Sequence, residues 1–598
     1  MLSRSPLRLF SRSFGGRVQP LKATKPIKAR PVTSAAPAPS ASSGSHHQGH
    51  HQHGNNQHQR WRFGRYAAVP LVVATGAVMT LRSRAKAEEP TSGGLSGISG
   101  VPASALVRAY LVYTLCGFPT LIDISPKLLD VCTKSPIPGV KQVTEAIIRR
   151  TFFDQFVAGE DIPECIRSVN ELGARGIGGV LNYSAEAEHD DGKHGDSHRA
   201  AEDANYQESY HAIEALGRHE ASLPPAAQGS ASYAIKLSGL IDIDILERAS
   251  NTLVRMRPLA GDKSLTDAPY PGVPQVCDAV VIAPSDTTSS RAMIPSVSGA
   301  IEPTGILASD PDVSDSDLAE LKVFWEKMRR LSDLAADSNV RLMIDAEYAA
   351  TQPAMDALTQ LLSMEYNRPR PGKPYHGPII FGTYQSYLRR APHLLDSALK
   401  HAEENGYALG IKIVRGAYFV KERKRWLKDG RTGADPIWPD KPATDAAYNQ
   451  SVSKIVSTLQ RQLAGPRPDL ALSVVFATHN PESVAHVTEE LKRAGLAEPS
   501  AETEYTGRLR LRDDVRGKLF VAQLFGMRDD ITDGVVQTFD SGAVPVALKY
   551  IAYGKLDEVL PFLARRAIEN KAVMAGEGGA SVERKRVSDE LWRRLVNA

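Results

Sequence analysis

Residues 340–346 read VRLMIDA, and residues 410–418 read GIKIVRGAY. Both stretches are short and apolar, which is typical of strands that are buried on both faces of a sheet. Eight such strands, separated by stretches long enough for helices, predict a parallel (βα)8 barrel of the TIM type, which is an α/β fold. The other six segments are GIGGVLNY at 176–183, YAIKLS at 233–238, IIFGTY at 379–384, SVVFAT at 473–478, LFVAQLF at 519–525 and VPVALKY at 544–550.

The rest of the chain adds a helical arm and connections to this barrel. Apolar residues at helical spacing predict an N-terminal helical arm over residues 104–170, and we expect the barrel itself over 171–585. Two long connections interrupt the barrel, at about 184–230 and about 251–337, and the first begins with a strongly hydrophilic stretch. We interpret both as insertions, because long connections are uncommon inside a compact domain.

The N-terminal leader is basic. No Asp or Glu precedes Glu88, whereas fourteen Lys or Arg do. Within residues 1–35, arginines are interleaved with leucine and phenylalanine, a composition typical of a mitochondrial transit peptide. A disordered basic tail has the same composition, but it does not explain the apolar residues at helical spacing. We therefore expect a transit peptide.

Two further segments separate this leader from the body of the chain. Residues 36–65 form a low-complexity tract rich in His, Ser and Pro, which we expect to be a disordered linker. Residues 66–81 form an uncharged apolar run of sixteen residues. A helix needs about 20 such residues to cross a bilayer. A membrane anchor, a sorting signal and an ordinary hydrophobic helix therefore all remain open for residues 66–81.

The charge of the body argues against nucleic acid as a partner. The whole chain carries a formal net charge of +4, but outside the leader fifty-eight basic residues stand against sixty-eight acidic ones. An acidic body does not suit binding to phosphate backbones. The four cysteines lack the paired spacing of a zinc site or a disulfide framework, so we expect no metal. They are Cys116, Cys132, Cys165 and Cys277.

Polar side chains mark the ends of the predicted strands. In a (βα)8 barrel the catalytic groups lie at the C-terminal ends of the strands, which meet at one face. Each of these residues has an ordinary structural explanation, such as an ion-paired lysine, a helix cap or a core histidine. Their coincidence favours a site, because buried charges are unfavourable unless they are paired or bind a ligand. They are Lys236, Asp345, Gln385, Lys412, Arg415, His479, Gln523 and Tyr550.

The segment KLDEVLPFLARRAIEN at 555–570 is the most specific feature of the chain. Its apolar residues form one stripe of an amphipathic helix. Arg565 and Arg566 are adjacent, and Glu569 lies one turn further, within reach of both. Adjacent guanidiniums suit bidentate binding of a small carboxylate, and Glu569 can orient one of them. A solvated helix face is the alternative, and the position directly after the last strand argues against it.

Taken in order, these motifs resemble those of the proline dehydrogenase family, with a mitochondrial, fungal-like eukaryotic member as the expected affinity. The resemblance implies oxidation of L-proline to Δ1-pyrroline-5-carboxylate by hydride transfer to FAD, the first step of proline catabolism. It also implies ubiquinone as the electron acceptor and a place on the matrix side of the inner mitochondrial membrane. It covers residues from about 160 to 575 and rests on MIDAEYAATQPAMD, FGTYQSYLRRAP, GIKIVRGAYFVKER, FATHNPES, VAQLFGM and YIAYGKLDEVLPFLARRAIEN.

The resemblance also implies roles for the residues that would bind the proline carboxylate. Arg565 and Arg566 are expected to hold it, with Glu569 supporting the pair. Lys236 is expected to lie beneath the carboxylate. The absence of a G-x-G-x-x-G motif between a strand and a helix excludes a Rossmann site. In the family this is expected, because FAD lies across the barrel mouth.

The remaining implied roles concern the proline ring and the flavin. Tyr550 is expected to close the pocket over the pyrrolidine ring, and Asp345 to position Tyr550. Two positions depart from the bacterial members, which have arginine where this chain has Lys412 and tryptophan where it has Phe419. The residues expected to contact FAD are Gln385, Lys412, Val414, Gly416, Tyr418, Thr444 and His479.

Three other functions remain open from the sequence. Hydroxyproline oxidation is the first, and Tyr550 argues against it because a phenol packed over the ring clashes with a ring hydroxyl. The second is a Schiff-base aldolase with Lys236 as the nucleophile. The third is a catalytically inactive, membrane-tethered regulatory barrel, which does not explain why the whole set of polar residues is present.

Overall fold

The computed structural model describes residues 97–596 with internal gaps. The chain divides into two units, Met1–Val73 and Ala74–Ala598, and all described residues belong to the second. The expected transit peptide, linker and apolar segment, residues 1–81, lie outside the described residues. The gaps are 119, 121, 123, 125–130, 133–134, 185–195, 261–267, 276–277, 279–309, 373–374, 432, 501–506, 541 and 575–579.

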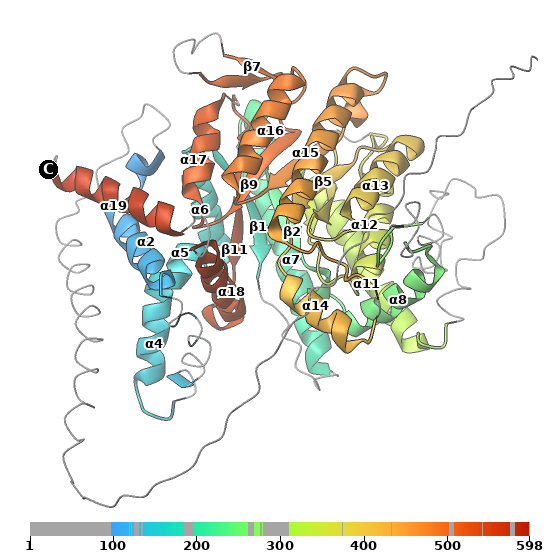
Figure 1. Cartoon of the computed structure of the whole chain (residues 1–598), viewed down its shortest axis with the longest axis horizontal. Coiled ribbons are helices and arrows are strands. Elements are labelled where there is room, and N and C mark those ends of the chain that lie inside the picture. Colours follow the sequence, from blue (N-terminus) through green and yellow to red (C-terminus); the bar gives the residue numbers. More distant parts are fainter. Residues whose placement is uncertain are drawn as a thin grey trace, which may run out of the picture. The chain divides into compact units, whose positions relative to one another are not determined.

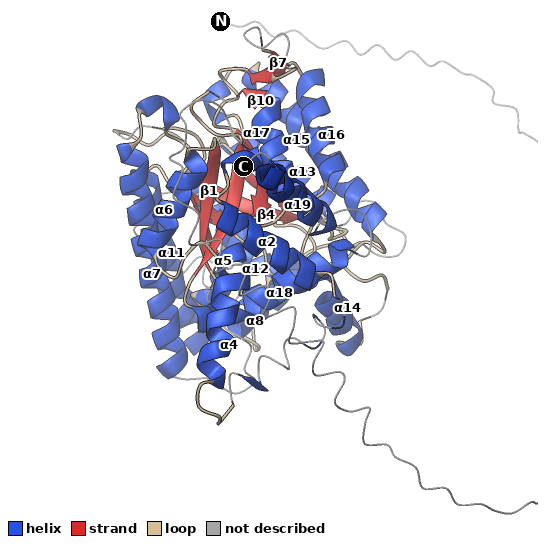
Figure 2. Cartoon of the chain, turned by 90° about the vertical axis from the view of Figure 1, so that its left-hand side faces the viewer, coloured by secondary structure: helices blue, strands red, loops and turns tan. Residues whose placement is uncertain are grey.

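A closed barrel of eight parallel strands forms the centre of this unit (Figures 1 and 2). The strands follow chain order around the ring, and the last one pairs with the first. All eight segments predicted from the sequence form these strands, so the predicted α/β barrel is confirmed. The strands are β1 (Ile177–Tyr183), β2 (Ser232–Ile235), β3 (Arg341–Ile344), β4 (Ile380–Gln385), β5 (Gly410–Val414), β6 (Ser473–Ala477), β9 (Leu519–Leu524) and β11 (Ala547–Tyr553).

Helices that connect the strands cover the outside of the barrel (Figure 1). Their apolar faces and the outward side chains of the strands form one continuous core. The helices are α7 (Asp196–Ser222), α8 (Ile243–Met256), α11 (Asp315–Asp337), α12 (Gln352–Tyr366), α13 (Ala391–Asn405), α14 (Phe419–Lys428), α15 (Lys441–Leu463), α16 (Pro481–Arg493), α17 (Asp529–Thr538) and α18 (Leu556–Met574).

Two of these helices lie within 184–230 and 251–337, the stretches that the sequence led us to interpret as insertions. Helix α7 follows β1 and buries Ala212, Ile213 and Leu216 in the barrel core. Helix α11 precedes β3 and buries residues such as Phe324 in the same core. Both belong to the barrel itself. Helix α7 was not predicted from the sequence, because its solvent-exposed face is highly charged and only a narrow stripe of the helix is apolar.

The N-terminal arm packs beside β11. Its elements are α2 (Ala103–Cys116), α4 (Val140–Ile148), a π-helical turn (Arg149–Phe153), α5 (Asp154–Phe156) and α6 (Ile162–Gly173). Val157 forms a bridge with Ala552 of β11, so this part of the arm lies at the C-terminal end of a barrel strand. The Tyr113 hydroxyl on α2 donates a hydrogen bond to the carbonyl of Gly526 over 2.7 Å. The arm is therefore attached to the barrel by polar as well as apolar contacts.

Several elements were not predicted from the sequence. Helix α19 (Ala580–Val596) packs on α2 through Val587, Leu106 and Tyr113. A small sheet is formed by β7 (Ala497–Pro499), β8 (Leu509–Leu511) and β10 (Phe539–Asp540). The short 3-10 helices are η1 (Gly97–Gly100), η3 (Pro225–Ala227), η4 (Leu237–Gly239) and η5 (Pro468–Leu470).

Arg341, the first residue of β3, closes the interior of the barrel at the N-terminal ends of its strands. Its guanidinium donates to the carbonyl of Gly517 over 2.6 Å and lies 4.7 Å from the centroid of the Phe520 ring. Burial lowers its pKa to about 10, so the group still carries its charge at neutral pH. Next to Arg341, toward the C-terminal strand ends, lies an apolar layer made of Val180, Ala234, Met343, Phe381, Val475, Phe520, Ala522 and Leu548. Polar side chains in the interior are thus confined to the two ends.

The two ends of the barrel differ in what surrounds them. Helices α14 and α18, which follow the C-terminal ends of β5 and β11, lie at the lower end in Figure 1, and β7 lies at the opposite end. We call the end with α14 and α18 the barrel mouth. Among the described residues, no helix combines the length and the apolar character that are needed to cross a bilayer.

Candidate active site

Three side chains meet across the interior of the barrel mouth. Asp345 directly follows β3, Lys412 lies on β5 and Tyr550 on β11. The Tyr550 hydroxyl donates to Oδ2 of Asp345 over 2.6 Å, and the Lys412 ammonium forms an ion pair with Oδ1 of the same carboxylate. Strands β3 and β11 are not neighbours in the ring, so these contacts cross the interior. The structure therefore brings three of the sequence-predicted residues together.

Burial fixes the ionisation of this group. It raises the pKa of Tyr550 well above the ordinary value, and the negative charge of Asp345 raises it further. Tyr550 is therefore a protonated donor at physiological pH. The side chains of Lys412 and Asp345 are 7% and 14% exposed, and each compensates the charge of the other. Lys412 also lies 5.3 Å from the centroid of the Tyr550 ring, so both partners restrict this ring.

Helix α18 presents a fixed guanidinium to the same region. Arg566 is 6% exposed and donates to Oε1 of Glu569 over 2.6 Å. Its guanidinium carbon lies 4.8 Å from the centroid of the Phe562 ring, one turn earlier. Arg565 precedes it on the helix and is half-buried. An acid and a ring thus orient Arg566, as the sequence spacing predicted for Glu569.

His479 lies at the end of a neighbouring part of the ring. It follows β6, and its Nε2 accepts a hydrogen bond from the backbone N–H of Leu524 over 3.0 Å. Burial, together with the positive charges of Lys549 and Arg566, lowers the pKa of His479 to about 3. His479 is therefore neutral and carries its proton on Nδ1, where it is a donor. The charge of Arg566 thus acts on His479, which follows β6, and on Tyr550, which lies on β11.

Glu347 is a buried acid that the sequence analysis missed. It is 5% exposed, and its Oε1 accepts a hydrogen bond from the backbone N–H of Ser238 over 3.1 Å. Burial raises its pKa, while the hydrogen bonds from Ser238 and the charge of Lys236 lower it. Lys236 and Glu347 therefore lie near each other at the ends of β2 and β3. The motif MIDAE carried the signal, because Glu347 stands two residues after Asp345.

Gln385 ends β4 beside these groups. Its Nε2 donates to the backbone carbonyl of Glu347 over 3.1 Å. Its Oε1 is buried and has no hydrogen-bond partner among the described residues. A buried acceptor without a partner is unfavourable unless a ligand or water satisfies it. Gln385 therefore marks a place where a bound donor group is expected.

Gly416 is required by the protein's own packing. Its φ is +127°, and a Cβ at this position would lie 2.0 Å from the ring of Tyr387. Gly416 was expected to contact FAD, and the Tyr387 ring is by itself a sufficient reason for a glycine here. Val414 and Tyr418 lie on either side, and both are partly exposed. The Tyr418 ring lies 4.6 Å from the ring of Tyr348.

Thr444 forms its hydrogen bond within helix α15 and its cap. It is in the first turn of α15, and its hydroxyl donates to the carbonyl of Asp440 over 3.1 Å. Among the described residues, no hydrogen bond joins Thr444 to the other predicted site residues.

Two strand-end residues point out of the barrel, which corrects the expectation of a single polar ring. Arg415 donates to Asp445 over 2.7 Å and to Ser483 over 2.7 Å, so it binds helices α15 and α16. Gln523 accepts from the Thr532 hydroxyl of α17 over 2.7 Å. Both residues alternate with inward neighbours on their strands, so their side chains lie on the outer face.

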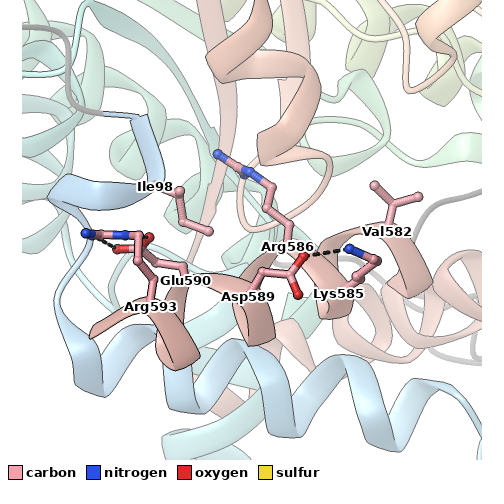
Figure 3. A pocket seen from close by; sticks show the side chains of 7 residues that line it. All are labelled: Ile98, Val582, Lys585, Arg586, Asp589, Glu590 and Arg593. Carbon is pink, nitrogen blue, oxygen red and sulfur yellow. Dashed lines mark hydrogen bonds and ion pairs between the residues drawn. The ribbon is translucent and has the colours of Figure 1, made fainter. Parts of the chain in front are cut away.

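A shallow hollow of about 450 Å³ lies along α19, as Figure 3 shows. Its charged groups satisfy one another, since Lys585 pairs with Asp589 and Arg593 with Glu590, each over 2.7 Å. It contains none of the predicted site residues and offers no uncompensated charge to a ligand. In the part of the chain that the structure describes, no group of acidic, histidine or cysteine side chains is arranged to hold a metal ion.

Comparison with known proteins identifies the family. The family profile described as "Proline dehydrogenase" matches residues 165–576, which is more than half of the chain. The chain belongs to the proline dehydrogenase family. It is accordingly an oxidoreductase of the proline dehydrogenase type, as the order of the sequence motifs predicted. Residues 165–576 include the eight strands and Arg566.

Several curated relatives align with this chain over most of their length. Hydroxyproline dehydrogenase of Xenopus laevis is 27% identical over 492 residues, covering 82% of this chain and 87% of the relative. Proline dehydrogenase 2, mitochondrial, of Arabidopsis thaliana is 26% identical over 505 residues, covering 83% and 89%. Proline dehydrogenase 1, mitochondrial, of Drosophila melanogaster is 25% identical over 571 residues, covering 82% and 78%. These relatives are from animals and a plant, so the fungal-like affinity stays a prediction.

A solved structure shares the fold. The barrel resembles proline utilization A (PutA) of Bdellovibrio bacteriovorus with a TM-score of 0.52 and 12% sequence identity. The match covers 84% of this chain and 41% of the PutA chain. The chain thus spans less than half of the PutA length, and the likeness concerns the fold alone.

Proposed function

We propose that this chain oxidises L-proline to Δ1-pyrroline-5-carboxylate and uses FAD as its hydride acceptor. The observation that carries the proposal is the buried guanidinium of Arg566, fixed by Glu569 and close to the Asp345–Tyr550 pair at the barrel mouth. A cationic group beside a rigid phenol suits an amino acid with a carboxylate and a small apolar ring.

The residues at the mouth suit a flavin. Gln385 offers a buried acceptor without a partner among the described residues, and neutral His479 offers a donor at Nδ1. Together they suit the alternating donors and acceptors of an isoalloxazine edge. We propose that Gln385, Lys412, Val414, Gly416, Tyr418, Thr444 and His479 hold FAD. When bound, FAD supplies the acceptor for the hydride that leaves proline.

The chain's own residues bind and orient the substrate. Arg565 and Arg566 hold the carboxylate, and Lys236 lies beneath it with its charge balanced by nearby Glu347. Tyr550 covers the pyrrolidine ring. In the reaction C5 of proline loses a hydride and the ring nitrogen loses a proton, which forms the C=N bond of the product. Orientation of C5 toward the acceptor is the main contribution of these residues to the rate.

Asp345 acts through Tyr550. It accepts the hydrogen bond from the phenol and the ion pair from Lys412, so it holds a strand β11 side chain and a strand β5 side chain in one arrangement. Lys412 was expected to contact FAD, where its ammonium would supply positive charge. The ion pair with Asp345 shares that charge, so Lys412 has a second role in positioning Tyr550.

We propose ubiquinone as the final electron acceptor and the matrix side of the inner mitochondrial membrane as the location. The names of the Drosophila and Arabidopsis relatives include "mitochondrial", which supports the organelle. Residues 1–35 would then be the transit peptide, 36–65 a linker, and 66–81 an anchor or sorting segment.

Hydroxyproline oxidation is the second candidate, because several relatives are named hydroxyproline dehydrogenase. The held position of Tyr550 opposes it, since the ring cannot move aside without losing its bond to Asp345. Comparing kcat/KM for L-proline and trans-4-hydroxy-L-proline decides between them. A preference for hydroxyproline would assign the chain to the second activity.

The main experiment is the absorption spectrum of the purified full-length protein before and after anaerobic addition of L-proline. We expect the bands of oxidised flavin, which L-proline then bleaches. Borohydride trapping in the presence of substrate is the control for the aldolase alternative, and covalent labelling of Lys236 would defeat the flavin mechanism. Protein that purifies without flavin and gains none on incubation with FAD would favour the inactive regulatory barrel.

A further inference from the structure

Helix α14, at the barrel mouth, turns its arginines and its acid toward the protein, which is unusual for a surface helix. Its arginines face the protein, where Arg423 pairs with Asp435 over 3.0 Å and Arg425 binds Glu247. Glu422, the acid of the helix, is buried and accepts a hydrogen bond from the backbone of Ala349. Helix α14 is thus attached to the barrel by its polar groups.

The outer face of α14 combines apolar and basic residues. Val420 is 50% exposed and Leu427 is 77% exposed. Lys424 and Lys428 are exposed as well, and neither forms an ion pair with any residue that the structure describes. The usual arrangement of a surface helix is inverted here, because large apolar residues face water and the acid is buried.

The N-terminal arm exposes a second set of apolar residues. Val143 and Ile147, one turn apart on α4, are 60% and 43% exposed. Ile137, just before α4, is 64% exposed, and Phe118, after α2, is 56% exposed. Large side chains exposed in such a group are unusual for a surface that faces only water.

Both sets lie at the barrel mouth. Figures 1 and 2 are related by rotation about the vertical axis, and in both α14 and α4 lie at the lower end with α18. The bridge between Val157 and Ala552 agrees with this, since it joins the end of the arm to the C-terminal end of β11. We call the exposed residues Val420, Lys424, Leu427 and Lys428 of α14, together with Ile137, Val143 and Ile147, the mouth patch.

We propose that the mouth patch binds the surface of an anionic lipid bilayer, so that the barrel mouth faces the membrane. Apolar side chains enter the headgroup region, and the lysines contact anionic lipid phosphates. The proposal rests on the proposed function, in that a membrane quinone would reach reduced flavin from this side. It adds a binding surface that the reaction itself does not require.

The lysines favour a bilayer over a protein partner. Lysine is depleted in the cores of protein–protein interfaces, whereas lysines interspersed with large apolar residues are typical of helices that lie on membranes. Helix α14 meets this description, because Lys424 and Lys428 are exposed beside Val420 and Leu427 and the acid of the helix is turned inward. A second copy of the chain would place these lysines against one another, which is unfavourable.

The test measures co-sedimentation of the full-length protein with vesicles of phosphatidylcholine and phosphatidylglycerol, compared with vesicles of phosphatidylcholine alone. We expect binding to the anionic vesicles that weakens as salt is added. The charge variant, Lys424→Glu with Lys428→Glu, is expected to bind roughly 30-fold more weakly from the lost attraction of two cations. The apolar variant, Val420→Gln with Leu427→Gln, is also expected to bind more weakly.

The matched control variants carry the same kinds of substitution at exposed residues outside the mouth patch. Lys400→Glu with Lys454→Glu alters the net charge equally on α13 and α15, and Leu595→Gln replaces an exposed leucine of α19. Both controls should bind like the parent. Proline oxidation with a soluble dye as acceptor should be unchanged in every variant, because none of these residues belongs to the site.

Three results would overturn the proposal. The first is that the parent shows no preference for anionic vesicles. The second is that the parent and both patch variants bind vesicles equally. The third is that a patch variant changes the mass of the protein in solution and leaves its vesicle binding unchanged. The last result would indicate a contact between copies. Loss of the dye reaction in the parent would instead contradict the proposed function, so the two failures are distinguishable.

Discussion

Removal of one hydroxyl group tests how the structure holds the proline ring. Tyr550→Phe deletes the 2.6 Å hydrogen bond to Asp345 and keeps the aromatic ring. A hydrogen bond to a charged group contributes about 1.5–3 kcal/mol. If the bond holds the ring in the transition state, kcat/KM for L-proline falls roughly 10- to 150-fold. Asp345 keeps its ion pair with Lys412, so no buried charge is left uncompensated and the fold should persist.

The assay is steady-state oxidation of L-proline with a soluble acceptor, together with the rate of anaerobic flavin reduction. Tyr366→Phe is the matched control, because Tyr366 also donates to an acid, Asp333, over 2.9 Å, but does so on the outer helices. We expect Tyr366→Phe to lower the free energy of unfolding and to leave kcat/KM unchanged. Unchanged kcat/KM in Tyr550→Phe, or an equal loss in both variants, would refute the reasoning.

Two further predictions concern stability. Gly416→Ala should destabilise the protein far more than Gly430→Ala, because both positions have positive φ but only the first places its Cβ 2.0 Å from the Tyr387 ring; equal midpoints in urea would contradict this. His479→Gln should reduce sensitivity to acid: the unfolded chain binds a proton at histidine below pH ~6.5, whereas the folded chain resists protonation down to about 3. Stability is therefore lost as the pH falls through that window, and at pH ~5 the parent should lose up to about 2 kcal/mol that the variant keeps. Unfolding curves at neutral and acid pH measure this, with exposed His393→Gln as the control, and equal pH dependence of parent and His479→Gln would contradict it.

The strands and the closing helix could be predicted because their sequence patterns are local. Buried parallel strands are continuous apolar runs, and the spacing of Arg566 and Glu569 already brings them together on one helix. The contact between Asp345 and Tyr550 came from the family resemblance and not from the pattern, since 205 residues separate them in the chain. Long-range contacts of this kind leave no periodic signal.

Other features could not be predicted for physical reasons. Strands that are buried on both faces do not reveal which side chains point inward, so Arg415 and Gln523 were grouped with the inward residues. Helix α7 has a charged outer face, and a sequence so rich in charged residues is also typical of a loop. Helix α19 docks by burying Glu583, which accepts a hydrogen bond from the backbone of Asp530 over 2.6 Å, and a buried acid has no signature in the sequence.

The most direct test of the account compares L-proline with L-prolinamide, which lacks the carboxylate charge, in the parent and in Arg566→Met. The parent should strongly prefer L-proline. Arg566→Met should retain flavin and lose about 100-fold or more of that preference, because the lost partner is a buried guanidinium fixed by Glu569. The same preference in both proteins would contradict the claim that this guanidinium binds the substrate carboxylate.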